Sequence, residues 1–182
     1  MATLSVAHPH VFVDASVTAL FDKSGFSGVQ NHWVYDEIFS AAMVASADAN
    51  HDGKLSGPDI GKLKQLILGP LEQHNYFNYI QVKTDFLKAD SVSDFKAVVK
   101  NGKLELDFVV RFAVPAVTDY TMLVLVVADP TNYIQMTTDM ENSDAKAPAE
   151  IEVEYFADSL DGLTLFKAFR SEIPGLYLRF KR

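Results

Sequence analysis

The chain has 182 residues, of which 48% are hydrophobic and 12% aromatic, enough to bury the core of a single domain. Its formal net charge of -8 argues against nucleic acids and anionic membranes as partners, because both bind clustered Lys and Arg. The absence of Cys excludes disulfides and thiolate metal sites. The longest apolar run, residues 122–128, is too short for direct membrane insertion.

The first residues have features of an export signal. Residues 1–7 are too short for a complete secretory signal, yet Ser5-Val6-Ala7 is similar to the small-x-small end of a cleavage site. We therefore expect residues 1–7 to be a residual signal or an added segment. Residues 8–182 are then expected to form one domain.

Two histidines and an aspartate lie on one face of the first predicted strand. The alternating pattern of residues 8–17 places His8, His10 and Asp14 together on that face. Glycines within residues 22–28 predict a turn into a second strand, and in one register His32 lies across from Asp14.

Such a cluster of His8, His10, Asp14 and His32 suits zinc, nickel, cobalt or copper. A register slip of one residue would put His32 on the opposite face. In the other interpretation these histidines are hydrogen-bonded or solvent-exposed, and Asp14 is a structural hydrogen-bond acceptor.

Residues 48–59 match a twelve-residue EF-hand calcium loop, with Gly53 at the sixth position, where the chain must turn sharply. The final position holds Asp59 where the motif usually has Glu, and this shorter arm should weaken calcium binding and shift the preference toward magnesium. The predicted ligands are Asp48, Asn50, Asp52, the backbone carbonyl of Lys54, Ser56 and Asp59.

Apolar residues at helical spacing lie on both sides of this loop. They predict an EF-hand-like helix pair at about residues 35–73, inserted between the N-terminal hairpin and a C-terminal β-rich part. Calcium sensors generally use paired loops, whereas only one such loop occurs here, so the expected role of the cation is to brace the fold.

Most of the remaining sequence reads as strands. The whole predicts an α+β fold, mainly antiparallel sheet and sandwich-like, with one inserted EF-hand-like helix-loop-helix. Residues 138–149 are polar and predict an exposed loop. The expected strands cover residues 76–82, 95–99, 104–114, 122–128, 151–156, 163–169 and 176–180.

The sequence contains no obvious catalytic motif. There is no glycine-rich phosphate loop, nucleophile elbow or thiol. A metal-activated water at the histidine cluster could support hydrolysis, with Glu37 as a candidate base. A simpler role for Glu37 is as an acid in the first turn of a helix. We therefore expect a binding protein and not an enzyme.

Five sequence blocks occur in a specific order. Together they resemble the domain-of-unknown-function 1007 family, bacterial exported proteins labelled as the periplasmic component of an uncharacterised ABC-type transport system. The resemblance spans roughly His8 to Tyr133. The blocks are residues 8–14 (HPHVFVD), 32–40 (HWVYDEIFS), 48–56 (DANHDGKLS), 76–79 (YFNY) and 127–133 (VADPTNY).

Members of this family are often encoded beside transporters of nickel, cobalt or related metals. The resemblance therefore implies a periplasmic metal-binding accessory of a membrane metal transporter, with a transition metal at the histidine cluster and structural calcium at the loop. The alternative is a solute-binding or scaffold protein of an ABC-type system whose only metal is structural calcium. Two departures weaken the match: Ala128 stands where the family tends to have an aromatic residue, and the residues after Ser159 match no motif.

Overall fold

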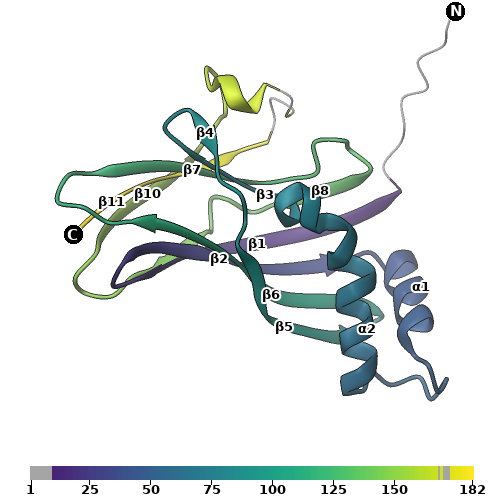
Figure 1. The fold of residues 1–182 in the computed structure, drawn as a ribbon. Helices are drawn as coiled ribbons and strands as arrows, with labels where there is room; N and C mark the ends of the chain where they lie inside the picture. The colour runs from purple at the N-terminus through teal and green to yellow at the C-terminus, as the bar shows by residue number, and fades with distance from the viewer. Residues whose placement is uncertain (1–9, 168, 170–172) are drawn as a thin grey trace, which may run out of the picture.

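The computed structural model describes residues 10–167, 169 and 173–182. Two β-sheets packed face to face contain most of the secondary structure, and two α-helices lie beside them (Figure 1). The elements in chain order are β1 (Val11–Asp22), β2 (Gly25–Tyr35), α1 (Glu37–Ala47), α2 (Gly57–Leu68), the 3-10 segment η1 (Gly69–Phe77), β3 (Asn78–Val82), β4 (Asp85–Phe86), β5 (Ser91–Lys100), β6 (Lys103–Pro115), β7 (Thr121–Val127), β8 (Ile134–Thr138), β9 (Asp144–Lys146), β10 (Glu152–Asp158), η2 (Thr164–Phe166) and β11 (Gly175–Lys181).

The first sheet, sheet A, has the strand order β5-β6-β2-β1-β8, and β9 also pairs with β1. Its strands are antiparallel except at β1, which pairs in parallel with β8 and β9. The second sheet, sheet B, has the order β10-β11-β7-β3-β4. Strands distant in sequence are therefore neighbours in both sheets.

Strict alternation along β1 separates the core from the outer face of sheet A. The odd-numbered residues from Val11 to Phe21 are buried, whereas the even-numbered residues are exposed or half-buried. This is the pattern of an antiparallel-type strand with one face on the core. Trp33 of β2 is fully buried between Phe77 and Phe108, with ring centroids 6.5 and 4.8 Å away. Aromatic side chains thus fill the centre of the core.

Two different structures cover the inner face of sheet A. Sheet B covers one part, and α1 and α2 pack against the β5–β6 side (Figure 1). Ser40 attaches α1 to sheet A. Its Oγ accepts a hydrogen bond from the Leu104 N–H of β6 at 2.8 Å and donates one to the Tyr35 carbonyl of β2 at 3.3 Å. The two sheets are themselves linked by a buried hydrogen bond of 3.1 Å from Asn31 Nδ2 to Asn78 Oδ1.

The expected α+β fold with an inserted EF-hand-like helix-loop-helix is wrong. Strands dominate the structure, which is a sandwich-like pair of sheets, and its two helices form no clear EF-hand pair. The helices have 11 and 12 residues; α1 contributes Ala47 and α2 contributes Leu63, Ile67 and Leu68 to the core shared with the sheets. A loop motif determines the conformation of its own residues but not how the flanking helices pack. Without a second loop to pair with, the apolar faces of the helices pack on sheet A.

Two local expectations also fail. Residues 163–169 were expected to form a strand, but they include the 3-10 turn η2. The polar residues 138–149 were expected to be loop, yet they contain β9, which adds to the edge of β1. In the part of the chain that the structure describes, no helix has the length and hydropathy needed to cross a bilayer.

Candidate functional site

The acidic loop, residues 48–59, connects the end of α1 to the first turn of α2. Asp48 follows the last residue of α1, and Asp59 is the third residue of α2, so each carboxylate is fixed by a helix end. Both are buried, with 7% and 4% of their surface exposed. The Gly53 N–H donates to Asp48 Oδ2 at 2.8 Å, and the Ala49 N–H donates to Asp59 Oδ1 at 3.4 Å. Asp59 therefore joins the two ends of the loop, and Asp48 holds its central turn.

Asp59 forms a capping box with Ser56. The Ser56 hydroxyl and backbone N–H both donate to Asp59 Oδ2, at 2.5 and 2.9 Å. These hydrogen bonds lower the pKa of Asp59 below its ordinary value, and the one from the Ser56 hydroxyl has the larger effect. Asp59 is thus an anion at neutral pH that serves both the loop and the start of α2.

The middle of the loop is exposed and rich in oxygen atoms. The Lys54 N–H donates to Asp52 Oδ1 at 2.8 Å, and Asn50 Nδ2 donates to Asp52 Oδ2 at 3.0 Å. Gly53 has a φ of +74°, which side chains rarely adopt, so glycine suits the turn. Carboxylate, amide, carbonyl and hydroxyl oxygens are the hard donors that Ca²⁺ and Mg²⁺ prefer, and the residues of the loop supply each of these donor types.

The structure places His10, Asp14 and His32 at separate points on or beside the outer face of sheet A. His8 lies outside the described residues. His10 is exposed just before β1, with its ring centroid 5.5 Å from that of Tyr133. Asp14 is exposed on the outer face of β1. His32, on β2, lies opposite Ser16 and not opposite Asp14, which pairs with Val34.

His10 and His32 are therefore not brought together. Six residues of strand separate His10 from Ser16, the partner of His32, a span of roughly 20 Å at about 3.3 Å per residue. His32 instead contacts Asp107 of β6, with Nδ1 and Oδ1 2.9 Å apart. Within residues 10–167, 169 and 173–182, no three His, Cys, Asp or Glu side chains are grouped so that they could hold a metal ion, either at the histidines or among Asp48, Asp52 and Asp59 of the acidic loop. Glu37 lies in the first turn of α1.

The neighbours of His10 and His32, which are Tyr133 and Asp107, were not predicted from the sequence. Residues 104–114 were expected to be a strand, and Glu105 and Asp107 alternate with Leu104, Leu106 and Phe108. That alternation indicates a polar outer face for β6, but it does not indicate which strand lies beside it. The β2–β6 pairing that brings Asp107 to His32 is visible only in the structure.

Two comparisons place the chain among known proteins. Residues 1–157 match the model of the family described as "Protein of unknown function (DUF1007)". An uncharacterized protein of Haemophilus influenzae is 26% identical over an alignment of 136 residues, and the match covers 72% of this chain. The chain spans 63% of the length of that curated relative. Neither description assigns an activity or a role in transport. Because the family model covers most of its residues, the chain belongs to the DUF1007 family.

Proposed function

We propose that this protein is a non-enzymatic binding or scaffold protein of the bacterial periplasm whose acidic loop holds one structural Ca²⁺ ion. The observation that carries this proposal is the donor set of residues 48–59, in which the carboxylates of Asp48 and Asp59 are buried and turned into the loop. The periplasmic location and the connection with a membrane transporter rest on the family resemblance.

Calcium would neutralise the charge that the loop gathers. Side-chain oxygens of Asp48, Asn50, Asp52, Ser56 and Asp59 and the backbone carbonyl of Lys54 would hold the ion. Since Asp48 ends α1 and Asp59 begins α2, bound calcium would also fix the two helices relative to each other.

The positions of the histidines support the calcium-only form of this proposal over a transition-metal accessory. A single ion cannot be ligated by two imidazoles roughly 20 Å apart along the sheet. His32 has a carboxylate partner in Asp107, which gives it a structural role on the outer face of sheet A. The transition-metal hypothesis would need His10 to act with His8 and other ligands.

Calcium is expected to stabilise the folded chain. At a free concentration one hundred times its dissociation constant, one bound ion adds about 2.7 kcal/mol to the free energy of unfolding. For a chain of this size that corresponds to a rise in Tm of roughly 5–10 °C. Thermal unfolding with added Ca²⁺ or with EDTA would measure the shift. Asp48→Asn should abolish it, whereas Asp85→Asn, which changes an exposed acid of β4, should leave it intact.

The metal content of the protein distinguishes the calcium-only form of the proposal from the transition-metal accessory. Plasma mass spectrometry of the purified protein should find calcium near one ion per chain, lost in Asp48→Ala and kept in His10→Ala. Zinc, nickel, cobalt or copper near one per chain, lost in His10→Ala alone, would overturn the calcium-only form. Absence of any Ca²⁺-dependent shift in Tm would overturn the calcium site itself.

A further inference from the structure

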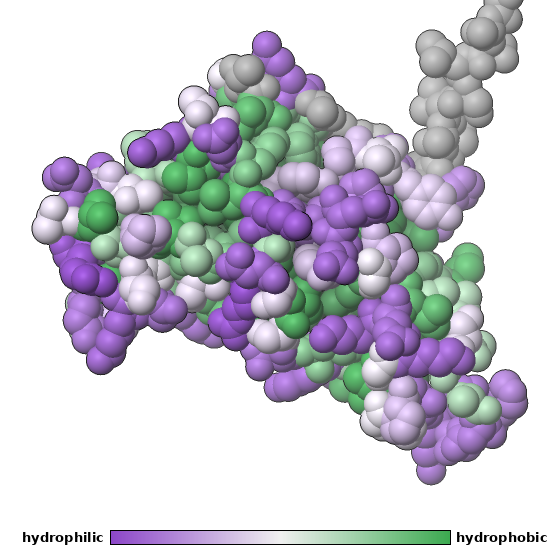
Figure 2. All heavy atoms as spheres, in the orientation of Figure 1, coloured by the Kyte–Doolittle hydropathy of each residue, from purple (hydrophilic) through white to green (hydrophobic). Residues whose placement is uncertain are grey.

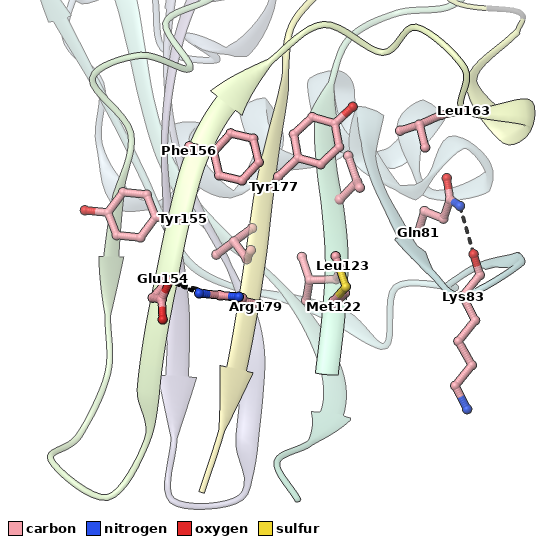
Figure 3. A pocket seen from close by; sticks show the side chains of 12 residues that line it. Gln81, Lys83, Met122, Leu123, Glu154, Tyr155, Phe156, Leu163, Tyr177 and Arg179 are labelled. Atoms are coloured by element: carbon pink, nitrogen blue, oxygen red, sulfur yellow. Dashed lines mark hydrogen bonds and ion pairs between the residues drawn. The ribbon is translucent and has the colours of Figure 1, made fainter. Parts of the chain in front are cut away.

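The outer face of sheet B carries a groove of about 480 Å³. Its lining comes from four neighbouring strands, β3, β7, β11 and β10 (Figure 3). Leu163 lines one end of the groove, next to a small apolar cluster that contains Leu160 and Phe166. Figure 2 shows apolar surface gathered on the side of the molecule that Figure 1 labels β4, β7 and β11, whereas the tip of the helices is hydrophilic.

The wall of the groove is a preformed aromatic surface. The rings of Phe156 and Tyr177 are stacked, with centroids 5.3 Å apart and planes only 6° from parallel (Figure 3). The Tyr177 hydroxyl donates to the Ser159 carbonyl at 2.5 Å, which fixes its ring. Phe156 is 61% exposed and Met122 is 68% exposed. Large apolar side chains left open to water beside a concave surface are typical of a ligand site.

Gln81, which lines the groove, has a side-chain oxygen with no hydrogen-bond partner among the described residues. Gln81 Nε2 donates to the Lys83 carbonyl at 2.8 Å, which orients the side-chain amide, while Gln81 Oε1 is buried and accepts no hydrogen bond from the described residues. A buried acceptor without a donor carries a desolvation penalty that a ligand donor would remove. Because Gln81 lines the groove, a rotation of its side chain would bring this acceptor to an N–H or O–H group of a ligand.

The charged groups at the other end of the groove are already paired. Arg179 contacts Glu154 at 2.5 Å, and Lys181 contacts Glu152 at 3.2 Å. Both cations also lie over the Tyr120 ring, at 4.8 and 4.5 Å from its centroid. Because this network satisfies its own charges, the end is polar without favouring a charged ligand. Lys83 also lines the groove, but its ammonium group extends away from Phe156 and Tyr177 (Figure 3).

We propose that this groove binds a small, uncharged, largely apolar molecule with a flat ring system and one hydrogen-bond donor. The ring lies against Phe156 and Tyr177, and the donor reaches Gln81 Oε1. The volume is within the range of about 300–1,000 Å³ that small-molecule pockets occupy. The inference rests on the binding role proposed above and names its ligand class, at a site on sheet B and away from the acidic loop.

The strand pairing argues against a peptide added to the sheet. A peptide that binds in this way pairs with the unpaired backbone of an edge strand. The floor of the groove is formed by β7 and β11, which are paired on both sides. The floor therefore offers side chains and no free backbone groups, which suits a small molecule, and a peptide paired with the open edge of β10 would lie beside the groove and not in it.

N-phenyl-1-naphthylamine is a suitable probe because it has a flat naphthalene ring, is uncharged and has one N–H group, and 1-phenylnaphthalene lacks the N–H. We expect the protein to bind the first probe saturably at one site, measured by fluorescence. Phe156→Ala should weaken binding at least fivefold. Gln81→Met should weaken it roughly three- to tenfold, as expected for one hydrogen bond, while leaving competition by 1-phenylnaphthalene unchanged. Ile38→Ala, which removes an 86% exposed apolar side chain on α1, is the matched control and should bind normally.

Three results would overturn the proposal. The first is no saturable binding, and the second is binding that neither Phe156→Ala nor Gln81→Met weakens. The third is a wild-type dimer in sedimentation that Phe156→Ala dissociates, because the groove would then be a subunit interface. Asp48→Asn should still bind the probe, so a failure of the calcium site and a failure of the groove are distinguishable.

Discussion

At the residue scale, Asp36 joins the first helix to the first strand. Its Oδ1 accepts from the Phe39 N–H and its Oδ2 from the Phe12 N–H, both at 2.9 Å. Burial raises the pKa of Asp36, but the N–H donors of Phe12, Phe39 and Ile38 outweigh it, and the pKa lies below its ordinary value. One carboxylate thereby caps α1 and fixes where it leaves sheet A.

We expect Asp36→Ala to lower the free energy of unfolding by about 1–2 kcal/mol at pH 7, since a cap and a second backbone contact are lost. Because the folded pKa is the lower one, the ionised carboxylate stabilises the fold above about pH 4, and this contribution disappears as the pH falls through the folded pKa. Urea unfolding between pH 2 and 7 would measure the difference. Glu37→Ala is the neighbouring control and should show little change. A deficit that stays constant down to pH 2 would contradict this role of Asp36.

Residue chemistry could be predicted from the sequence more readily than residue position. The oxygen donors of the acidic loop all lie within residues 48–59, so the short chain between them holds them near one another. The histidines lie on different strands, and whether they meet depends on register. A shift of two residues in the β1–β2 pairing keeps His32 on the expected face but places it opposite Ser16.

At the element scale, the β1–β2 hairpin depends on Gly25. Its φ is +140°, and a Cβ there would lie 2.2 Å from the Val114 carbonyl oxygen of β6. Gly61 in α2 differs in both respects, with open space around it and an ordinary helical backbone. The two glycines therefore form a matched pair for substitution.

Gly25→Ala should destabilise the protein by about 3 kcal/mol or more, because both the backbone angle and the contact with β6 oppose a side chain. Gly61→Ala should stabilise it by about 0.5–1 kcal/mol, as expected for alanine in an exposed helix interior. Denaturant unfolding of both variants would check the opposite signs. A harmless Gly25→Ala would mean that β6 does not approach the hairpin this closely.

Long apolar strands were predictable, whereas short polar ones were not. The strands expected at residues 104–114, 122–128 and 176–180 occur as β6, β7 and β11. By contrast, β8 and β9 are edge segments of five and three residues, in which exposed side chains alternate with half-buried ones. Their backbone pairs with β1, and that tertiary contact has no local signature in the sequence.

At the scale of the whole molecule, the family match ends at residue 157, but sheet B does not. Strand β11 lies between β10 and β7, and its inward residues Leu176, Leu178 and Phe180 are at most 2% exposed. Burying each contributes about 1.5–3 kcal/mol, so the strand contributes as much as the net stability of a typical domain. The C-terminal residues thus complete the core.

We expect a chain ending at Asp158 to lose cooperative thermal unfolding, and a peptide of residues 159–182 added in trans to restore it in part. Near-ultraviolet circular dichroism would follow both. A short glycine insertion after Gly162, which is exposed, lengthens the preceding loop and should be tolerated. A sharp transition in the shortened chain alone would show that sheet B forms without β11.

The parallel pairing of β1 with β8 and β9 also bears on folding during synthesis. The first strand emerges early from the ribosome, but these partners lie in the last third of the chain. At about 5–20 residues per second, β1 waits on the order of ten seconds for them. Such distant pairing gives a high contact order, which slows folding. During that interval the hydrophobic row of β1 is a natural target for chaperones.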